Sequence, residues 1–276
     1  MLSRVLTVAA QEIRIGIRNR WILLATVILA VFSLALALLG SAPAGTLGVD
    51  RLTITVASLA SLSVYLVPLI ALLLAFDAVC GEVERGTLLM TFSCPISRSE
   101  FLIGKALGHT LVLTFALVIG YGLTAGLLVV TGGGSMTGLI DFSRLIATSI
   151  LLGICFLAIG YVLSSLTRQS GTAAAAAIAA WLLLVVLYDL ALLGALVANP
   201  SGVFASDVFP YAVLLNPADA FRLFNLAALG ASDLVGGMAG VSETLPFSPA
   251  LALVSLLAFA AGLLSLSALL IRRMTP

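Results

Sequence analysis

Charged side chains gather in one stretch of this sequence, residues 80–105, which separates two long apolar runs. Charged side chains stay in water, so the stretch is expected to be a loop or short helix that joins the two apolar runs and faces one aqueous side. We interpret the stretch as a handle by which another protein moves the apolar segments on either side. Its six charged residues are Glu82, Glu84, Arg85, Arg98, Glu100 and Lys105.

Catalysis and nucleotide binding have few candidate residues. His109 is the single histidine, and the sequence contains neither a Gly-x-Ser-x-Gly motif nor a two-histidine zinc-protease motif. Gly104 and Lys105 lack the upstream glycine and the downstream Ser or Thr of a phosphate-binding loop. We therefore expect a chain that is not an enzyme and binds no cofactor of its own.

Potential metal ligands are scattered along the chain. Cys80, Cys94, Cys155 and His109 form no cluster with ligand spacing, so we predict no metal site and interpret them as packing residues. The cysteines are odd in number and form no Cys-x-x-Cys pair, which argues against structural disulfides.

The composition is that of an integral membrane protein. Hydrophobic residues make up 62% of the 276 residues and charged residues 9%, with a mean hydropathy of +1.24, against roughly 25% charged residues in soluble domains. The basic residues form no patch interleaved with aromatic side chains, so the sequence gives no support for nucleic-acid binding.

Six apolar stretches approach the roughly 20 residues that a helix needs to cross the hydrocarbon core. Lipid offers no hydrogen-bond partner to open backbone, so all six are predicted to be helices of one all-α transmembrane domain. They cover residues 21–40, 54–79, 106–131, 145–166, 172–198 and 250–271. Residues 1–20, which include Arg14, Arg18 and Arg20, are predicted to form an amphipathic helix on the membrane surface; a solvated basic tail is the alternative.

The distribution of basic residues predicts the orientation. Ten lie in the termini or in connections on their side, and three on the other side, so both termini and residues 80–105 are expected to be cytoplasmic. The ten are Arg4, Arg14, Arg18, Arg20, Arg85, Arg98, Lys105, Arg168, Arg272 and Arg273, and the three are Arg51, Arg144 and Arg222.

The external connection 199–249 is too apolar for a free linker. Asn216 before Pro217 is predicted to cap a short helix with Asp219 in its first turn. The connection is expected to pack on the outer membrane surface or on an external partner. Within the spans, Asp77 and Asp189 have no cationic partner in their own segment, which weakens the case for an ion-coupled carrier.

The handle itself is predicted to contain a helix over residues 82–90 with a flexible point at Gly86 and Thr87. Pro95 should end any helix before it, because the residue preceding proline is driven to extended geometry. Ser97 or Ser99 is expected to cap the helix that re-enters the membrane.

Two sequence patterns in this stretch resemble the signature of ABC-2 type permeases, the membrane subunits of one class of ATP-binding-cassette transporters. The first is Glu82-x-Glu84-x-Gly86-Thr87-Leu88, and the second is Pro95-Ile96-Ser97-Arg98 followed by Gly104-Lys105. The six spans, the amphipathic N-terminus and the long last external connection extend the resemblance over nearly the whole chain.

The resemblance implies a homodimer in the lipid bilayer that carries two cytoplasmic ATPase subunits, with ATP and Mg²⁺ on those subunits, and a periplasmic β-helical protein outside. It makes residues 82–98 the helix that couples to the ATPase, including Arg85 and Ile96, with Arg14, Arg18 and Arg20 alongside. It also implies contact of the periplasmic partner with Asn216, Asp219, Phe221 and Arg222.

Within the family, the resemblance is to the branch that serves copper-site assembly of nitrous oxide reductase in denitrifying bacteria. The sequence shows no chain of copper ligands, so the cargo is either another species, such as a sulfur species, or the permease delivers mechanical work. An ABC-2 exporter of another cargo, a secondary carrier and a membrane anchor are the alternatives.

Overall fold

The computed structural model describes residues 2–39, 51–131, 136–199, 202–228 and 247–273, and within these ranges the chain is helical without strands. Six of its helical segments are long and apolar enough to cross a membrane. They are α2 (Arg20–Leu39), α4 (Arg51–Ala75), α7 (Arg98–Val130), α8 (Met136–Leu166), the continuous α9 (Ser170–Trp181), η1 (Leu182–Leu187) and α10 (Tyr188–Ala198), and α13 (Ala250–Arg273). The chain is an all-α integral membrane protein.

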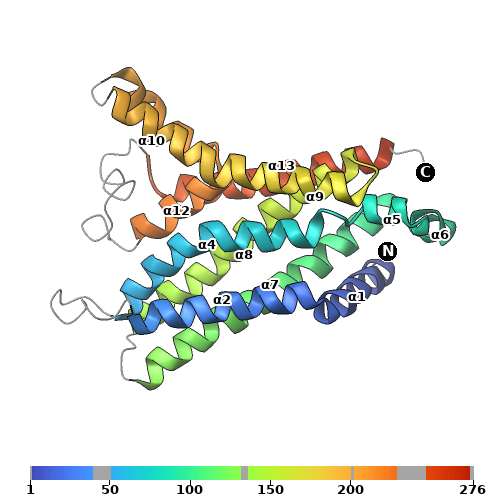
Figure 1. Cartoon of the computed structure of the whole chain (residues 1–276), viewed down its shortest axis with the longest axis horizontal. Helices are drawn as coiled ribbons and strands as arrows, with labels where there is room; N and C mark the ends of the chain where they lie inside the picture. Colours follow the sequence, from blue (N-terminus) through green and yellow to red (C-terminus); the bar gives the residue numbers. More distant parts are fainter. Residues whose placement is uncertain (1, 40–50, 132–135, 200–201, 229–246, 274–276) are drawn as a thin grey trace.

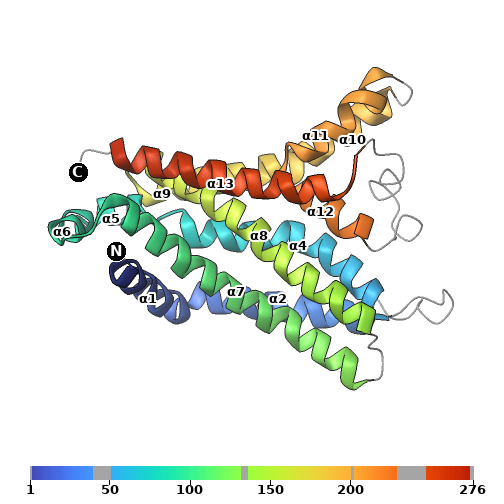
Figure 2. The same ribbon diagram turned by 180° about the vertical axis from the view of Figure 1, so that it is seen from behind.

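Shorter helices lie at both ends of this bundle. At the end that holds the two termini are α1 (Leu2–Arg18), α5 (Cys80–Glu84) and α6 (Thr87–Ser93), as Figures 1 and 2 show. At the opposite end, the connection between the last two spans folds into η2 (Phe204–Val208), α11 (Phe209–Leu214) and α12 (Pro217–Ala228). Because six spans are an even number, α1 and the end of α13 lie on the same side of the membrane.

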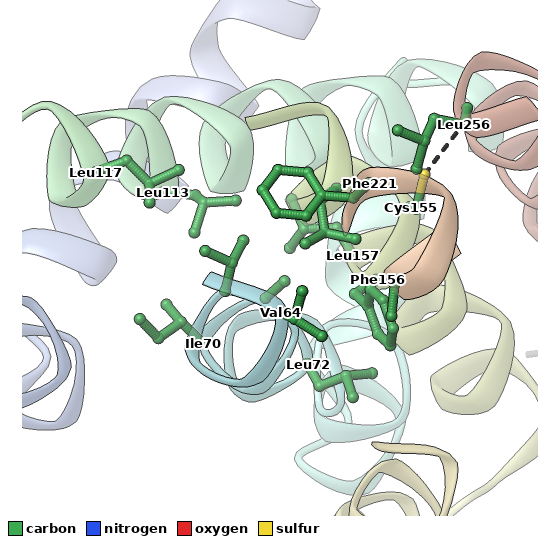
Figure 3. Packing of buried hydrophobic residues seen from close by; sticks show 14 of the residues in the cluster. Val64, Ile70, Leu72, Leu113, Leu117, Cys155, Phe156, Leu157, Phe221 and Leu256 are labelled. Carbon is green, nitrogen blue, oxygen red and sulfur yellow. Dashed lines mark hydrogen bonds between the residues drawn. The ribbon is translucent and has the colours of Figure 1, made fainter. Parts of the chain in front are cut away.

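The centre of the bundle is the contact between α4 and α8. Gly160 of α8 permits close approach, because a Cβ atom there would lie 2.5 Å from the Cβ of Ala75. Val64, Leu113 and Phe156 are among the fully buried side chains around this contact, and the ring of Phe221 from α12 joins the same cluster (Figure 3). Helix α12 is therefore part of the core.

Buried hydroxyl groups join the helices inside the apolar region. Ser63 of α4 bonds to the phenolic oxygen of Tyr121 of α7 at 2.6 Å, and Ser33 of α2 bonds to Thr124 of α7 at 2.6 Å. Such bonds between membrane helices are worth about 0.6 to 2 kcal/mol each, and they fix α7 against both neighbours.

Several bounds differ from those expected. The third helix begins at Arg98 and the fourth at Met136, so residues 98–105 belong to a long α7 rather than to the connecting segment. The reason is a capping box: the Ser97 hydroxyl accepts from the Glu100 N–H, and the Glu100 carboxylate accepts from the Ser97 N–H, which fixes the start of the helix. Part of the external connection, residues 229–246, lies outside the described residues.

Candidate functional site: the α5–α6 segment and its buried anchor

The charged stretch forms two short helices that meet at a glycine. Gly86, between α5 and α6, has a φ of 69°, in the left-handed region that side chains with a Cβ disfavour. The helix predicted over residues 82–90 is therefore broken at Gly86, where a flexible point was expected. Cys94 is extended and ends α6 one residue before Pro95, as the sequence predicted.

The tip of this segment combines charged and apolar surface. Glu84, Arg85 and the α6 residues Leu89 and Met90 are exposed, the last two by 60% and 73%. Leu88, by contrast, is buried against the bundle. Exposed apolar side chains rimmed by charges are typical of a surface that another protein covers.

Glu84 of the segment and Arg98, the first residue of α7, contact the ends of distant helices. The Glu84 carboxylate accepts from the N–H and the hydroxyl of Ser170 at 2.9 and 2.5 Å, so it caps the first turn of α9. The Arg98 guanidinium donates to the carbonyls of Ile271 and Arg272 at 2.9 and 3.0 Å, at the last turn of α13. The Glu84 contact joins the segment to the fifth span, and the Arg98 contact joins the start of α7 to the sixth span.

The base of the segment is held by a buried lysine. Lys105 of α7 places its Nζ 2.5 Å from Oε1 of Glu12 and 2.6 Å from Oε1 of Glu82, and the Lys105 side chain is 5% exposed. Glu12 belongs to α1 and Glu82 to α5, so one cation joins the N-terminal helix and the α5–α6 segment to the third span. We call Glu12, Glu82 and Lys105 the anchor triad.

A second branch leads from the triad into the bundle. His109 Nε2 lies 3.1 Å from Oε2 of Glu12, and His109 Nδ1 lies 2.7 Å from the hydroxyl of Tyr161 on α8. Burial disfavours the charged form of Glu12, but the contacts with His109 and Lys105 outweigh it and hold the pKa of this carboxyl at about 2. Glu12 is therefore ionised at neutral pH.

Glycines allow α1 to lie close enough to form the triad. A Cβ atom at Gly104 would lie 2.6 Å from the Cβ of Val8, and one at Gly108 would lie 2.6 Å from the Cβ of Glu12. Any side chain at these two positions of α7 would push α1 away, because real Cβ atoms do not approach so closely. The glycines and the triad together fix the position of α1.

Comparison with known proteins identifies this arrangement as part of a transporter. Residues 6–274 match the ABC-2 family transporter protein family. The chain belongs to this family. It is 39% identical over 274 residues, 99% of both chains, to the probable ABC transporter permease protein NosY of Stutzerimonas stutzeri. It is 41% identical over 270 residues, 97% of both chains, to the probable ABC transporter permease protein NosY of Pseudomonas aeruginosa.

A small polar cavity accompanies the anchor triad of this ABC-2 permease. It has a volume of about 120 Å³ and is also lined by Asp77, Arg85 and His109. A space of this size admits water molecules, which lower the cost of burying charges. Within the part of the chain that the structure describes, no three His, Cys, Asp or Glu side chains form a group able to hold a metal ion.

The predicted interfacial helix, α1, has a face that packs against the bundle as well as an exposed basic face. Arg14 and Arg18 are exposed on α1, and Arg20 is exposed at the start of α2 rather than on α1 itself. The buried face contains Val5, Val8, Ala9, Glu12 and Gly16. The helix therefore packs along the start of α7 while its arginines point outward.

Of the four residues expected to contact a periplasmic partner, three are buried inside the bundle and Arg222 is partly buried. Asn216 donates to the carbonyl of Leu184 at 2.6 Å and to Asp219 at 2.7 Å, and it caps α12 by accepting from the N–H of Ala218. Asn216, Asp219 and Phe221 are each at most 1% exposed. The caps and the apolar face of α12 turn these side chains inward, which differs from the expected position on an outer contact surface.

Arg222 supplies the partner that Asp189 lacks within its own span. Its Nη1 lies 3.0 Å from Oδ2 of Asp189 on α10 and 3.7 Å from Oδ1 of Asp219. Burial raises the pKa of Asp219 to about 6; the Arg222 charge opposes this rise, while the Asp189 charge adds to it. The ion pairs join α12 to the fifth span.

Sequence reasoning missed the contacts made by Glu12, His109 and Tyr161. Glu12 was grouped with a surface helix and His109 with packing residues, although both are buried and bonded to each other. One signal in the sequence points to them: Gly104 and Gly108 flank Lys105 at the spacing of a close helix contact. That spacing predicts a helix packed on this face of α7 but does not say which one.

Proposed function

We propose that this permease transmits movement from a separate cytoplasmic ATPase to its membrane helices through the α5–α6 segment. The chain itself is the non-catalytic subunit, and ATP and Mg²⁺ bind to the partner. The observation that carries the proposal is the Lys105 contact with both Glu12 and Glu82. A displacement of the exposed tip would reach α1 and α7 together through this contact.

The transmission follows from packing. The tip has exposed Leu89 and Met90 to enter a groove of the ATPase, and Glu84 connects the same segment to α9. Arg98, at the start of α7, connects that helix to α13. Packed helices shift between discrete arrangements as near-rigid bodies. Closure of two ATPase subunits on ATP would therefore move several spans at once.

The proposed assembly is a homodimer of this chain with two ATPase subunits similar to NosF and a periplasmic β-helical protein similar to NosD. The excess of basic residues at the end with both termini and α5–α6 supports a cytoplasmic location of that end, in a bacterial inner membrane. The proposed role is copper-site assembly of nitrous oxide reductase, which the sequence resemblance implies, and the similarity to NosY permeases agrees with that branch of the family.

The permease either moves a sulfur species as its cargo or performs mechanical work on the periplasmic partner. Both agree with the lack of a group of metal ligands among the described residues. An ABC-2 exporter of another cargo has the same machinery and is the second candidate. A secondary carrier has less support, because Asp189 is paired with Arg222 and the ion pair joins two helices.

Co-purification tests the proposal. The permease is expressed with the ATPase and the β-helical protein of its own transporter, and the complex is isolated in detergent through a tag on the permease. We expect the double variant Leu89→Asp/Met90→Asp to lose the ATPase and to keep the β-helical protein.

The matched control is Val130→Asp, which alters an exposed apolar residue at the opposite end of α7, where Val130 is 86% exposed. This variant should retain the ATPase. Full recovery of the ATPase with the tip variant would exclude α6 as its docking site, and failure to recover any ATPase with the unaltered permease would exclude the proposed function.

A further inference from the structure

A second cavity, separate from the anchor triad, opens between three spans. It has a volume of about 520 Å³ and lies between α7, α8 and α13 near the end that holds the termini. Figure 2 shows these three helices on one side of the molecule. Its walls are mainly apolar and include Ile103, Leu107, Leu157 and Ala268. Ile103 and Leu107 are each 43% exposed, so the cavity is a groove open to the surroundings.

The mouth of the groove is polar and basic. Ser99 and Arg272 line it where α7 begins and α13 ends. The Arg98 bonds to the carbonyls of Ile271 and Arg272 hold these two helix ends together, so the mouth is a built feature. The Arg272 side chain is exposed, and no ion pair between it and another described residue is seen.

The groove has the length of one membrane leaflet. It extends along α7 from Ser99 to Thr110 and along α13 from Arg272 to Leu264, which at 1.5 Å per residue is about 12 to 16 Å. Half of a hydrocarbon core about 30 Å thick is about 15 Å. A molecule with a headgroup at Arg272 and an extended apolar chain matches both ends of the groove.

We propose that this groove binds an anionic phospholipid, with the phosphate group at Arg272 and one acyl chain between α7, α8 and α13. The charge complementarity favours this occupant over a second copy of the chain, because a symmetric contact here would bring together two sets of Arg272 and Arg273. A water-soluble partner is disfavoured because the groove lies alongside membrane spans. The proposal does not depend on which protein docks at α6.

The bound lipid would contact Tyr161, which is linked to the anchor triad through His109. Tyr161 lines the groove and its hydroxyl bonds to His109, which contacts Glu12. Leu102 and Ala106 line the groove, while Lys105 lies on the triad side of the same turns of α7. A filled groove therefore supports α7 from the side opposite to α1.

Native mass spectrometry of the full-length permease in detergent tests the proposal, with phosphatidylglycerol and phosphatidylcholine of identical acyl chains as probes. A basic residue near a lipid headgroup contributes about fivefold in affinity, so we expect at least about fivefold preference for phosphatidylglycerol. Arg272→Gln should remove this preference. Arg273→Gln removes the same surface charge outside the groove and should keep most of it.

A second pair of variants tests the position of the acyl chain. Ala268→Phe fills the groove and should lower binding of both lipids several-fold, whereas Ala261→Phe, at an exposed position of α13 outside the groove, should leave both unchanged. Equal effects of Arg272→Gln and Arg273→Gln, or unchanged lipid binding in Ala268→Phe, would overturn the proposal. So would a loss of dimer in Ala268→Phe with normal lipid binding, because the groove would then hold a second copy.

Discussion

The charge of Lys105 is buried and is shared by two acids. Its ammonium group faces carboxylates from two different helices, and each partner is at most 15% exposed. Removing one member of a buried charge group costs about 3 to 5 kcal/mol, because the remaining charges lose their compensation. Forming such a group adds little net stability, because burying the charges costs about as much as their attraction returns. The triad is therefore better suited to fix one arrangement of helices than to add stability.

A first prediction separates these two roles. Lys105→Met leaves Glu12 and Glu82 buried without their cation, so we expect a lower thermal midpoint in detergent and loss of permease-dependent ATPase activity. The triple variant Glu12→Gln/Glu82→Gln/Lys105→Met removes all three charges and should recover most of the thermal midpoint but not the coupling. Coupling at the unaltered level in the triple variant would show that the triad only stabilises the fold.

The titration of Asp219 is expected to make the stability of the permease depend on pH. Burial, with a contribution from the Asp189 charge, raises the pKa of this carboxyl from 3.8 to about 6 against the opposing effects of Arg222 and Asn216, so the folded chain binds this proton more tightly than the unfolded chain. The stabilisation is complete below the unfolded pKa and is lost as the pH rises through about 6. The pKa of Glu12, at about 2, lies below this window.

We therefore expect the thermal midpoint of the permease in detergent to fall between about pH 4.5 and about pH 7.5. Asp219→Asn keeps a polar side chain beside Asn216 and removes the titration, so its midpoint should change less over the same range. The interpretation fails if the variant and the unaltered protein show the same dependence on pH.

At the scale of elements, the angle between α5 and α6 depends on the backbone of Gly86. A Cβ atom there meets nothing within 4 Å, so the limit on substitution is the φ of 69° and not space. A β-branched residue in the left-handed region costs about 1 to 2 kcal/mol, whereas asparagine tolerates it.

Gly86→Val is accordingly expected to reorient α6 and to lower ATPase stimulation by the permease several-fold without affecting membrane insertion. Gly86→Asn is the matched control and should retain most of the stimulation. Measurement of ATPase activity in reconstituted complexes of equal composition distinguishes the two. Equal activity of both variants would mean that the left-handed turn is not required for coupling.

The elements themselves could largely be predicted from the sequence, because long apolar runs and the signals at Gly86, Pro95 and Ser97 are local. The actual start of α7 at Arg98 depends on a reciprocal bond between Ser97 and Glu100. The burial of Glu12 and of the α12 side chains could not be predicted, because it depends on which helices pack together. The glycine spacing on α7 indicates a close neighbour, but only the three-dimensional arrangement identifies it as α1.

At the scale of the whole molecule, both described ends of the chain and the α5–α6 segment lie at one end of the bundle (Figure 1). The tip of the segment extends beyond the spans, whereas the triad lies where α1, α5 and α7 meet. In the proposed function, the tip is the docking surface and the triad is the point from which its displacement reaches α1 and α7. That proposal requires the tip to face the compartment that contains ATP.

The natural cysteines of the permease test that orientation without new substitutions. Cys94, next to α6, is exposed, whereas Cys80 and Cys155 are buried, so a membrane-impermeant maleimide should label Cys94 alone. We expect labelling in inverted inner-membrane vesicles and none in intact spheroplasts, with Cys94→Ser as the control that removes the signal. Bound ATPase should slow the labelling, because Cys94 adjoins the proposed docking surface. Labelling of Cys94 from the outside of spheroplasts would reverse the orientation and exclude contact of this segment with a cytoplasmic ATPase.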